Sequence, residues 1–222
     1  MELAGIVSLA PLPTAAERAA EVIRQQIFEG RFAPGTAIPE ASLAAALQVS
    51  RNTVREAYRT LVGEHLLVYT AHKGVRVRRL GVADVRDIYT ARGALELSAI
   101  ELLHDRPALD ATAFRGELDA GDRAATAGDW AGAGTANLRF HSRIAALHGS
   151  TRVDEFFRRL MTELRLGFLA LPDPRAFHEP YLRRNHEIAG LVTAGRLAEA
   201  GTALRAYLDE SAAEVAAAVG TG

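Results

Sequence analysis

The sequence predicts a mainly α-helical protein, in which a small N-terminal domain of three helices and a β-hairpin precedes a C-terminal bundle of about six helices. Hydrophobic residues make up 49% of the 222 residues and aromatic residues only 6%, so the apolar content is mostly aliphatic and alanine-rich, which favours helices. Apolar residues recur three and four positions apart along most of the chain, as on one helix face. Alternation appears between residues 66 and 79, where it indicates short strands.

Three helices are predicted in the N-terminal part. Residues 14–30 carry apolar side chains on one face and end at Gly30, a residue that commonly terminates helices. A second helix is expected at about residues 40–47, and a third begins after Ser50, whose hydroxyl suits the N-cap position. Because a turn of about three residues separates the last two helices, they have the proportions of a helix-turn-helix.

A β-hairpin with a basic tip follows the third helix. Residues 66–70 and 75–79 are rich in strand-forming side chains, and residues 71–74 connect them. The whole chain has a net charge of −1, but residues 50–79 carry seven basic and two acidic side chains, a net charge of +5. A local basic surface of this kind is typical of proteins that contact a polyanion. The helix-turn-helix and the hairpin together make a winged helix.

The third helix begins with side chains suited to reading DNA. Arginine can pair with guanine and asparagine with adenine in the major groove, and the N-terminal amides of a helix attract phosphate. The alternative is an amphipathic helix with a solvated polar face. The candidate DNA contacts on this helix and on the hairpin tip are Ser50, Arg51, Asn52, Thr53, Arg55, Arg59, His72, Lys73 and Gly74.

The C-terminal part is expected to be entirely helical. Arg158 and Arg159 are expected on a solvated helix face. The expected domains are an N-terminal arm at residues 1–13, a winged helix-turn-helix domain at 14–80 and a helical domain at 81–222. Glycine and proline residues separate six predicted helices at about residues 82–104, 108–127, 129–148, 151–170, 178–194 and 196–218.

The first domain resembles the GntR family of bacterial transcription regulators. The resemblance rests on residues 27–35, Leu43 with Ala44, residues 49–57 and the Lys73-Gly74 wing. It implies that Ser50, Arg51, Asn52, Thr53, Arg55, Lys73 and Gly74 contact an operator. The family usually has proline, leucine and glycine where this sequence has Thr53, Tyr58 and His65.

The second domain resembles the helical ligand-binding domain of the FadR subfamily, the FCD type. Residues 89–96, 137–141 and 184–208 carry this resemblance. Many members hold a divalent metal with one aspartate and three histidines, and the corresponding positions here are Asn137, His141, Asn185 and Tyr207. His186 lies one residue from the third position, which rotates its side chain by about 100° around the helix. This set lacks the carboxylate and the imidazoles that bind metals tightly, so no metal or other cofactor is expected.

The same positions predict an effector pocket without a metal. Arg92 corresponds to an arginine that many relatives direct toward an anionic ligand, and the predicted pocket consists of Arg92, Asn137, His141, Asn185 and Tyr207. A small molecule, such as a carboxylate, is expected to bind there by direct hydrogen bonds. The alternative is that Arg92 and Glu96 form a surface ion pair one helical turn apart and that His141 is an ordinary buried histidine.

The expected function is that of a homodimeric, DNA-binding transcription regulator, a repressor, which binds a near-palindromic operator on double-stranded DNA and is not an enzyme. A cytoplasmic location is expected for three reasons. The chain has no cysteine, its first 13 residues do not have the pattern of a signal peptide, and no apolar run is long enough to cross a membrane. Two alternatives stay open. A metal-dependent helical-bundle enzyme needs more inward-facing ligands than His141, and a winged-helix adaptor that binds protein would show no salt-dependent affinity for DNA.

Overall fold

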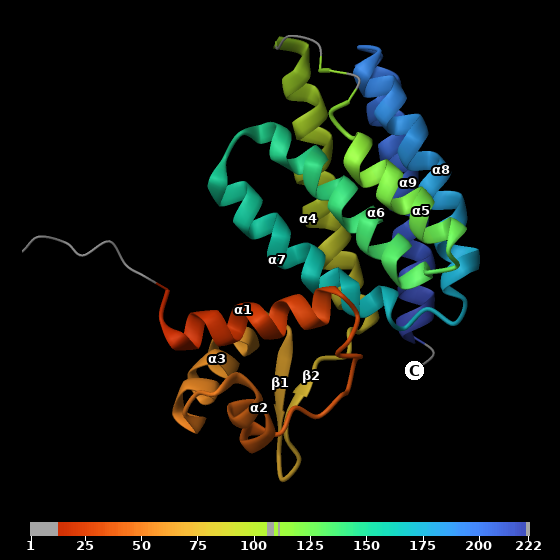
Figure 1. Cartoon of the computed structure of the whole chain (residues 1–222). Helices are drawn as coiled ribbons and strands as arrows, with labels where there is room; N and C mark the ends of the chain where they lie inside the picture. The colour runs from red at the N-terminus through yellow and green to blue at the C-terminus, as the bar shows by residue number, and fades with distance from the viewer. Residues whose placement is uncertain (1–12, 106–108, 111, 221–222) are drawn as a thin grey trace, which may run out of the picture.

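The computed structural model describes residues 13–105, 109–110 and 112–220, and it is mainly helical (Figure 1). The arm expected at residues 1–13 therefore lies, apart from Pro13, outside the described residues. No helix of the described ranges combines the length and the apolar content that crossing a bilayer requires. The N-terminal elements are α1 (Ala15–Phe28), α2 (Glu40–Leu47), α3 (Arg51–Gly63), β1 (Leu67–Thr70) and β2 (Gly74–Val77).

Helix caps and a small core form the N-terminal part. Thr14 and Glu17 make a capping box at the start of α1, and the Ser50 hydroxyl accepts a hydrogen bond of 3.0 Å from the backbone amide of Thr53 at the start of α3. Helices α1 and α3 pack against each other through side chains that are fully buried. These core residues are Ile23, Ile27, Val54, Ala57 and Leu61.

The hairpin is held to the loop that precedes α2. Strands β1 and β2 pair antiparallel, from Leu67 opposite Val77 to Thr70 opposite Gly74. A bridge between Ala37 and Arg76 adds the preceding loop to the edge of β2. The predicted winged helix-turn-helix is confirmed, and its wing is fixed on one edge by the α1–α2 loop.

The C-terminal part is a helical bundle, as predicted. In Figure 1, α4, α5, α6, α8 and α9 lie side by side, and α7 runs obliquely along the bundle beside α6 and down to α1. Its elements are α4 (Val82–Glu101), the short 3-10 helix η1 (Leu102–Asp105), α5 (Arg115–Thr126), α6 (Trp130–Ala145), the 3-10 helix η2 (Ala146–His148), α7 (Thr151–Phe168), α8 (Pro174–Thr193) and α9 (Leu197–Gly220).

Two predicted helix starts are wrong. The helix expected from residue 108 begins at Arg115, because residues 112–114 form a turn. The helix expected from residue 178 begins at Pro174, since the Asp173 carboxylate accepts a 2.9 Å hydrogen bond from the amide of Ala176. Proline is well suited to the first position of a helix because its missing N–H would have no partner there.

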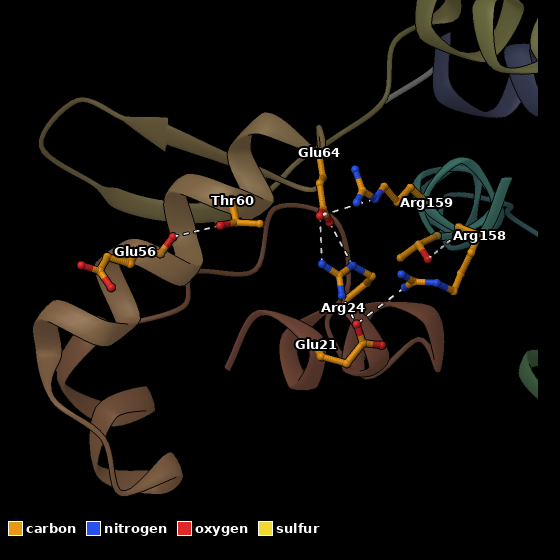
Figure 2. A network of polar contacts seen from close by, with 8 residues as sticks. Glu21, Arg24, Glu56, Thr60, Glu64, Arg158 and Arg159 are labelled. Atoms are coloured by element: carbon orange, nitrogen blue, oxygen red, sulfur yellow. Dashed lines mark hydrogen bonds and ion pairs between the residues drawn. The ribbon is translucent and has the colours of Figure 1, made fainter. Parts of the chain in front are cut away.

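Ion pairs join the two parts of the molecule where α7 meets α1 (Figure 2). Arg24 on α1 is buried and donates two hydrogen bonds of 2.9 Å to Glu64, the C-cap residue of α3, and it also pairs with Glu21. From α7, Arg158 lies 3.6 Å from Glu21 and Arg159 lies 3.8 Å from Glu64. Both arginines are exposed, as expected, and their solvated face of α7 also carries these ion pairs to α1 and α3.

A second set of ion pairs joins the end of the hairpin to the bundle. Arg78, just after β2, donates hydrogen bonds to Asp84 on α4 at 2.7 Å and to Glu163 on α7 at 3.0 Å. All three side chains are partly buried. The segment between the winged helix and the bundle is therefore held by charge-assisted bonds to both α4 and α7.

Candidate functional site

The exposed face of α3 carries the polar side chains that the sequence singles out. Arg51, Asn52, Arg55 and Arg59 are exposed and Thr53 is half-buried. The opposite face supplies the core side chains described above. The amphipathic pattern thus leaves a row of cationic and amide groups exposed, beginning at the first turn of the helix.

Contacts within the protein distinguish these candidates from one another. Arg55 Nε donates to Glu40 Oε2 at 2.9 Å, so Arg55 must leave an ion pair before it can bind an anion. Ser50 is engaged as the N-cap, and its hydroxyl lies 2.8 Å from that of Thr53. Within the described residues, Arg51 and Arg59 make no ion pair. Arg51 and Arg59 are therefore the freest cations of this face.

The hairpin tip adds a second cationic element. His72, Lys73 and Gly74 are all exposed, and His72 and Gly74 have φ values of +59° and +74°, a conformation that glycine adopts without strain. A groove of about 320 Å³ separates the hairpin from α2 and α3. Its lining includes Arg55, Arg59 and Lys73, and also Tyr69, which is 55% exposed.

Tyr69 was missed by the sequence analysis. The sequence analysis treated it only as part of a strand-forming run. Tyr69 and its neighbour Val68 are both exposed whereas Leu67 is buried, so strict alternation along β1 does not predict which side chain reaches the groove. A phenol beside a groove with three cations can pack on a sugar or donate a hydrogen bond to a phosphate.

Two departures from the family pattern have structural roles. The Tyr58 hydroxyl donates a 2.8 Å hydrogen bond to the carbonyl of Ile38, which ties α3 to the segment before α2. Burial raises the pKa of Tyr58 to about 12, so this hydroxyl keeps its proton. His65 has a φ of +59°, at the position where the family usually has glycine.

A cluster of buried polar side chains lies inside the helical bundle. Arg92 donates from Nε to Glu96 Oε1 at 2.8 Å, and His141 Nδ1 lies 2.5 Å from Glu96 Oε2. All three side chains are at most 1% exposed. The alternative of a surface pair between Arg92 and Glu96 is therefore wrong, because the pair is in the core.

The charges of this group follow from its contacts. Burial raises the pKa of Glu96, but Arg92 and His141 outweigh it and hold that pKa below its usual value. Burial lowers the pKa of His141, so the imidazole is neutral and its Nδ1–H donates to Glu96. The group is thus an ion pair of Arg92 and Glu96 with a neutral histidine bound to it.

The remaining predicted pocket residues join this cluster from α6, α8 and α9. Asn137 Oδ1 accepts hydrogen bonds from Asn185 Nδ2 at 3.1 Å and from the Tyr207 hydroxyl at 2.9 Å. The Tyr207 ring packs 4.7 Å from the His141 ring, measured between centroids. The structure therefore brings together all five residues that the sequence predicts for an effector pocket.

Three buried atoms of the cluster have no hydrogen-bond partner in the described part of the chain: Arg92 Nη2, His141 Nε2 and Asn185 Oδ1. A buried polar group without a partner costs about 1–3 kcal/mol, and such groups are rare in folded proteins. With the tautomer assigned above, the three atoms offer one cationic donor and two acceptors. They are the groups that a polar ligand entering the bundle would satisfy.

This donor set does not fit a divalent metal. The oxygen of Asn137 already accepts two hydrogen bonds, and Tyr207 OH is one of the donors. His186 does not replace the missing ligand, because its side chain is 46% exposed and pairs with Asp122 at 3.0 Å. Across the described ranges, no three His, Cys, Asp or Glu side chains are arranged to bind a metal ion.

Comparison with known proteins gives matches to both parts of the chain. The family "Bacterial regulatory proteins, gntR family" matches residues 15–77, and the FCD domain matches residues 87–210. A crystal structure from Rhodococcus sp. RHA1, described as a transcriptional regulator GntR, superposes with a TM-score of 0.85 at 37% identity, and the match covers 90% of this chain and 96% of that one.

Two curated relatives extend the comparison. An uncharacterized HTH-type transcriptional regulator from Streptomyces ambofaciens is 32% identical over 84% of this chain and 78% of its own length. A protein of Paenarthrobacter nicotinovorans named "Probable D-xylose utilization operon transcriptional repressor" is 33% identical over 59% of this chain and 58% of its own. In two further curated relatives the match spans only 37% and 36% of the relative's length. From these matches, and from the winged helix and helical bundle that carry them, the chain belongs to the GntR family of bacterial regulatory proteins and contains an FCD domain.

Proposed function

We propose that this protein is a sequence-specific DNA-binding transcription regulator, a repressor, whose affinity for its operator changes when a small molecule binds in the helical bundle. Residues 14–80 would form the DNA-binding domain and residues 81–222 the effector-binding and dimerisation domain. The observation that carries the proposal is the row of exposed Arg51, Asn52 and Arg59 on α3 beside the cationic hairpin tip. The family membership agrees with it, and a DNA partner implies a cytoplasmic location.

The geometry suits the major groove. A helix that presents arginine and asparagine from its first turns can reach base edges, while Lys73 and the wing bind the phosphate backbone. A homodimer would place two copies of α3 about 34–36 Å apart, one turn of DNA, on a near-palindromic operator. Sedimentation equilibrium of the full chain tests the dimer, and a monomer at the concentrations that bind operator would contradict it.

The proposed effector is a small carboxylate that also carries a hydroxyl group. Its carboxylate would pair with Arg92 Nη2, and its hydroxyl would donate to His141 Nε2 or Asn185 Oδ1, the atoms that lack partners. The ligand would act by binding one relative arrangement of the two domains better than the other. Nothing in this mechanism requires a metal or a catalytic step.

The DNA-binding part is tested by selecting bound sequences from a random duplex pool and measuring affinity by fluorescence anisotropy at several salt concentrations. We expect one enriched near-palindrome, an affinity that falls steeply with salt, and weaker binding by Lys73→Gln. Arg143→Gln is the matched control, because Arg143 lies on α6, far along the chain from α3, and its loss removes the same charge. No enrichment, or an affinity independent of salt, would reject DNA binding and support the protein-binding adaptor.

The effector part is tested by screening hydroxycarboxylates such as lactate and gluconate for a change in operator affinity. Arg92→Gln should abolish the response, with Arg86→Gln on the exposed face of α4 as the control. Because Arg92 is buried, Tyr207→Phe serves as a milder variant that removes one hydroxyl from the cluster. A full response in both Arg92→Gln and Tyr207→Phe would remove this cluster from the effector site.

A further inference from the structure

A cavity lies at the junction of the two domains, separate from the buried polar cluster. It has a volume of about 360 Å³ and is bounded by α1 on one side and by α6 and α7 on the other. This size is within the range of small-molecule sites, roughly 300–1,000 Å³. None of its lining residues belongs to the cluster of Arg92, His141 and their partners.

The lining combines an apolar floor with a cationic rim. Phe28, Phe157 and Met161 provide the floor. The charged residues of the lining are Arg24, Arg139, Arg158, Glu21 and Asp154, three basic and two acidic, so the lining keeps a net positive charge. An apolar floor below positive groups matches a molecule with an aromatic body and a single negative charge. Aromatic rings pack well against phenylalanine and methionine side chains.

Among the residues that the structure describes, one of these three arginines has no anionic partner. Arg24 is bound to Glu64 and Glu21, and Arg158 lies 3.6 Å from Glu21. Arg139 makes no ion pair among the described residues, and its guanidinium carbon lies 5.9 Å from the centre of the Phe28 ring. An exposed arginine over an aromatic wall is a suitable anchor for a carboxylate whose ring enters the cavity.

We infer that this interdomain cavity binds an aromatic monocarboxylate, with the carboxylate at Arg139 and the ring against Phe28, Phe157 and Met161. The site is separate from the proposed effector cluster, and its regulatory role rests on the proposed function. Its walls come from both domains, so a ligand that fills it binds one relative placement of α1 and α7 better than others.

The ion pairs of Figure 2 connect the cavity to α3. Arg24 and Arg158 line the cavity and also hold Glu21, while Arg24 holds Glu64 at the C-terminal end of α3. A carboxylate at Arg139 would add a negative charge to the cavity that Arg158 and Glu21 also line. Occupation of the cavity would therefore alter the contacts that fix the DNA-binding domain against α7.

The test uses 2-naphthoate as the probe, with 2-naphthalenemethanol as its uncharged analogue, in isothermal titration calorimetry with the full-length protein and no DNA. We expect naphthoate to bind at one site per chain, and Arg139→Gln to weaken it at least fivefold. Arg139→Lys should restore most of the affinity. Arg143→Gln, one turn further along α6 and outside the cavity, should leave it unchanged.

Two further variants separate this site from the buried cluster. Ala146→Phe adds bulk at the half-buried edge of the cavity and should abolish naphthoate binding, whereas Tyr207→Phe should not affect it. No binding of naphthoate, equal binding by Arg139→Gln and the wild type, or equal binding of the uncharged analogue would overturn the inference. So would loss of binding in Tyr207→Phe with retention in Ala146→Phe.

The regulatory role is measured on the selected operator. Naphthoate should change the operator affinity of the wild type, and Ala146→Phe should bind the operator normally but no longer respond. If naphthoate binds as expected but does not change the affinity of the wild-type protein for the operator, the regulatory role is refuted. Because the calorimetry contains no DNA, failure of the proposed DNA-binding function would not affect its result.

Discussion

The ion pair between Arg55 and Glu40 predicts that replacing an acidic residue will strengthen DNA binding. Arg55 is 57% exposed and lies on the proposed DNA-reading face, but Glu40 at the start of α2 accepts its hydrogen bond at 2.9 Å. A phosphate or a base can take the guanidinium only after this pair opens. Glu40→Gln removes the competing carboxylate and leaves the fold of the exposed helix start unchanged.

The size of the effect follows from the exposure of the pair. Pairs of this kind, with side chains 57% and 27% exposed here, are worth about 0.2–1 kcal/mol. A carboxylate about 10 Å from a phosphate adds a repulsion of about 0.4 kcal/mol in water before screening. Together these terms predict operator affinity about threefold to tenfold higher for Glu40→Gln at low salt.

The assay is fluorescence anisotropy on the selected operator at low and at high salt. The gain should shrink as salt rises, because screening weakens both contributions. Glu179→Gln is the control, since it removes the same charge from an exposed ion pair with Arg175 on α8. An affinity for Glu40→Gln no higher than that of Glu179→Gln at low salt would refute the placement of Arg55 at the DNA.

Four other substitutions test separate parts of the structure. Arg51→Ala should cost about 1–3 kcal/mol of operator binding and relax the base preference, as competition with random DNA would show. Glu64→Gln leaves the buried Arg24 with fewer acceptors and should lower the free energy of unfolding in urea by about 1–3 kcal/mol. His65→Gly should raise the free energy of unfolding by about 0.5–1 kcal/mol, because glycine adopts the φ of +59° without strain. Burial, and then the nearby charge of Arg165, lower the pKa of His178 from 6.5 to about 3. Below pH 6.5 this histidine is protonated in the unfolded chain but stays neutral in the native protein. The free energy of unfolding therefore falls toward pH 3, by up to about 1.4 kcal/mol per pH unit. His178→Gln should reduce this dependence on pH.

Each of these four has its own contradicting result. Unchanged discrimination between operator and random DNA in Arg51→Ala would remove this side chain from base reading. Glu64→Gln is compared with Glu179→Gln, and equal stability of the two variants would show that the junction pair contributes little. His65→Ala serves as the partner of His65→Gly, and equal stability of both would exclude backbone strain. A slope between pH 6.5 and 3 identical to that of the wild type would exclude His178 as its source.

Local signals in the sequence account for much of the fold. Ser50 predicted the start of α3, and the spacing of Val54 and Leu61 predicted its buried face. The alternating valines predicted the hairpin. The start of α8 was wrong because Pro174 was treated only as a helix breaker, although Asp173 before it caps the helix. Cap and proline together are a local signal that could have been used.

The sequence also predicts part of the buried cluster and nothing of the interdomain cavity. Five residues of the buried cluster were named through the family resemblance, and Glu96 was expected only as a surface partner of Arg92. The contact between Glu96 and His141 was not predicted, because the two residues come from different helices and meet only in the packed bundle. The interdomain cavity had no sequence signal. It depends on how α1 lies across α6 and α7, and a contact between such distant segments leaves no periodic pattern in the chain.

Helix α4 sets how the winged helix is rotated relative to the helical bundle. Its first turn holds Asp84, which is bonded to Arg78 after the hairpin, and its middle holds Arg92, which faces the core of the bundle. Because an α-helix turns by about 100° per residue, inserting one residue between them would swing Arg92 out of the core or twist the wing against the bundle. The length of helix between Asp84 and Arg92, eight positions, thus determines whether both contacts can form at once. Insertions or deletions in this interval should be far less tolerated than substitutions on its outer face.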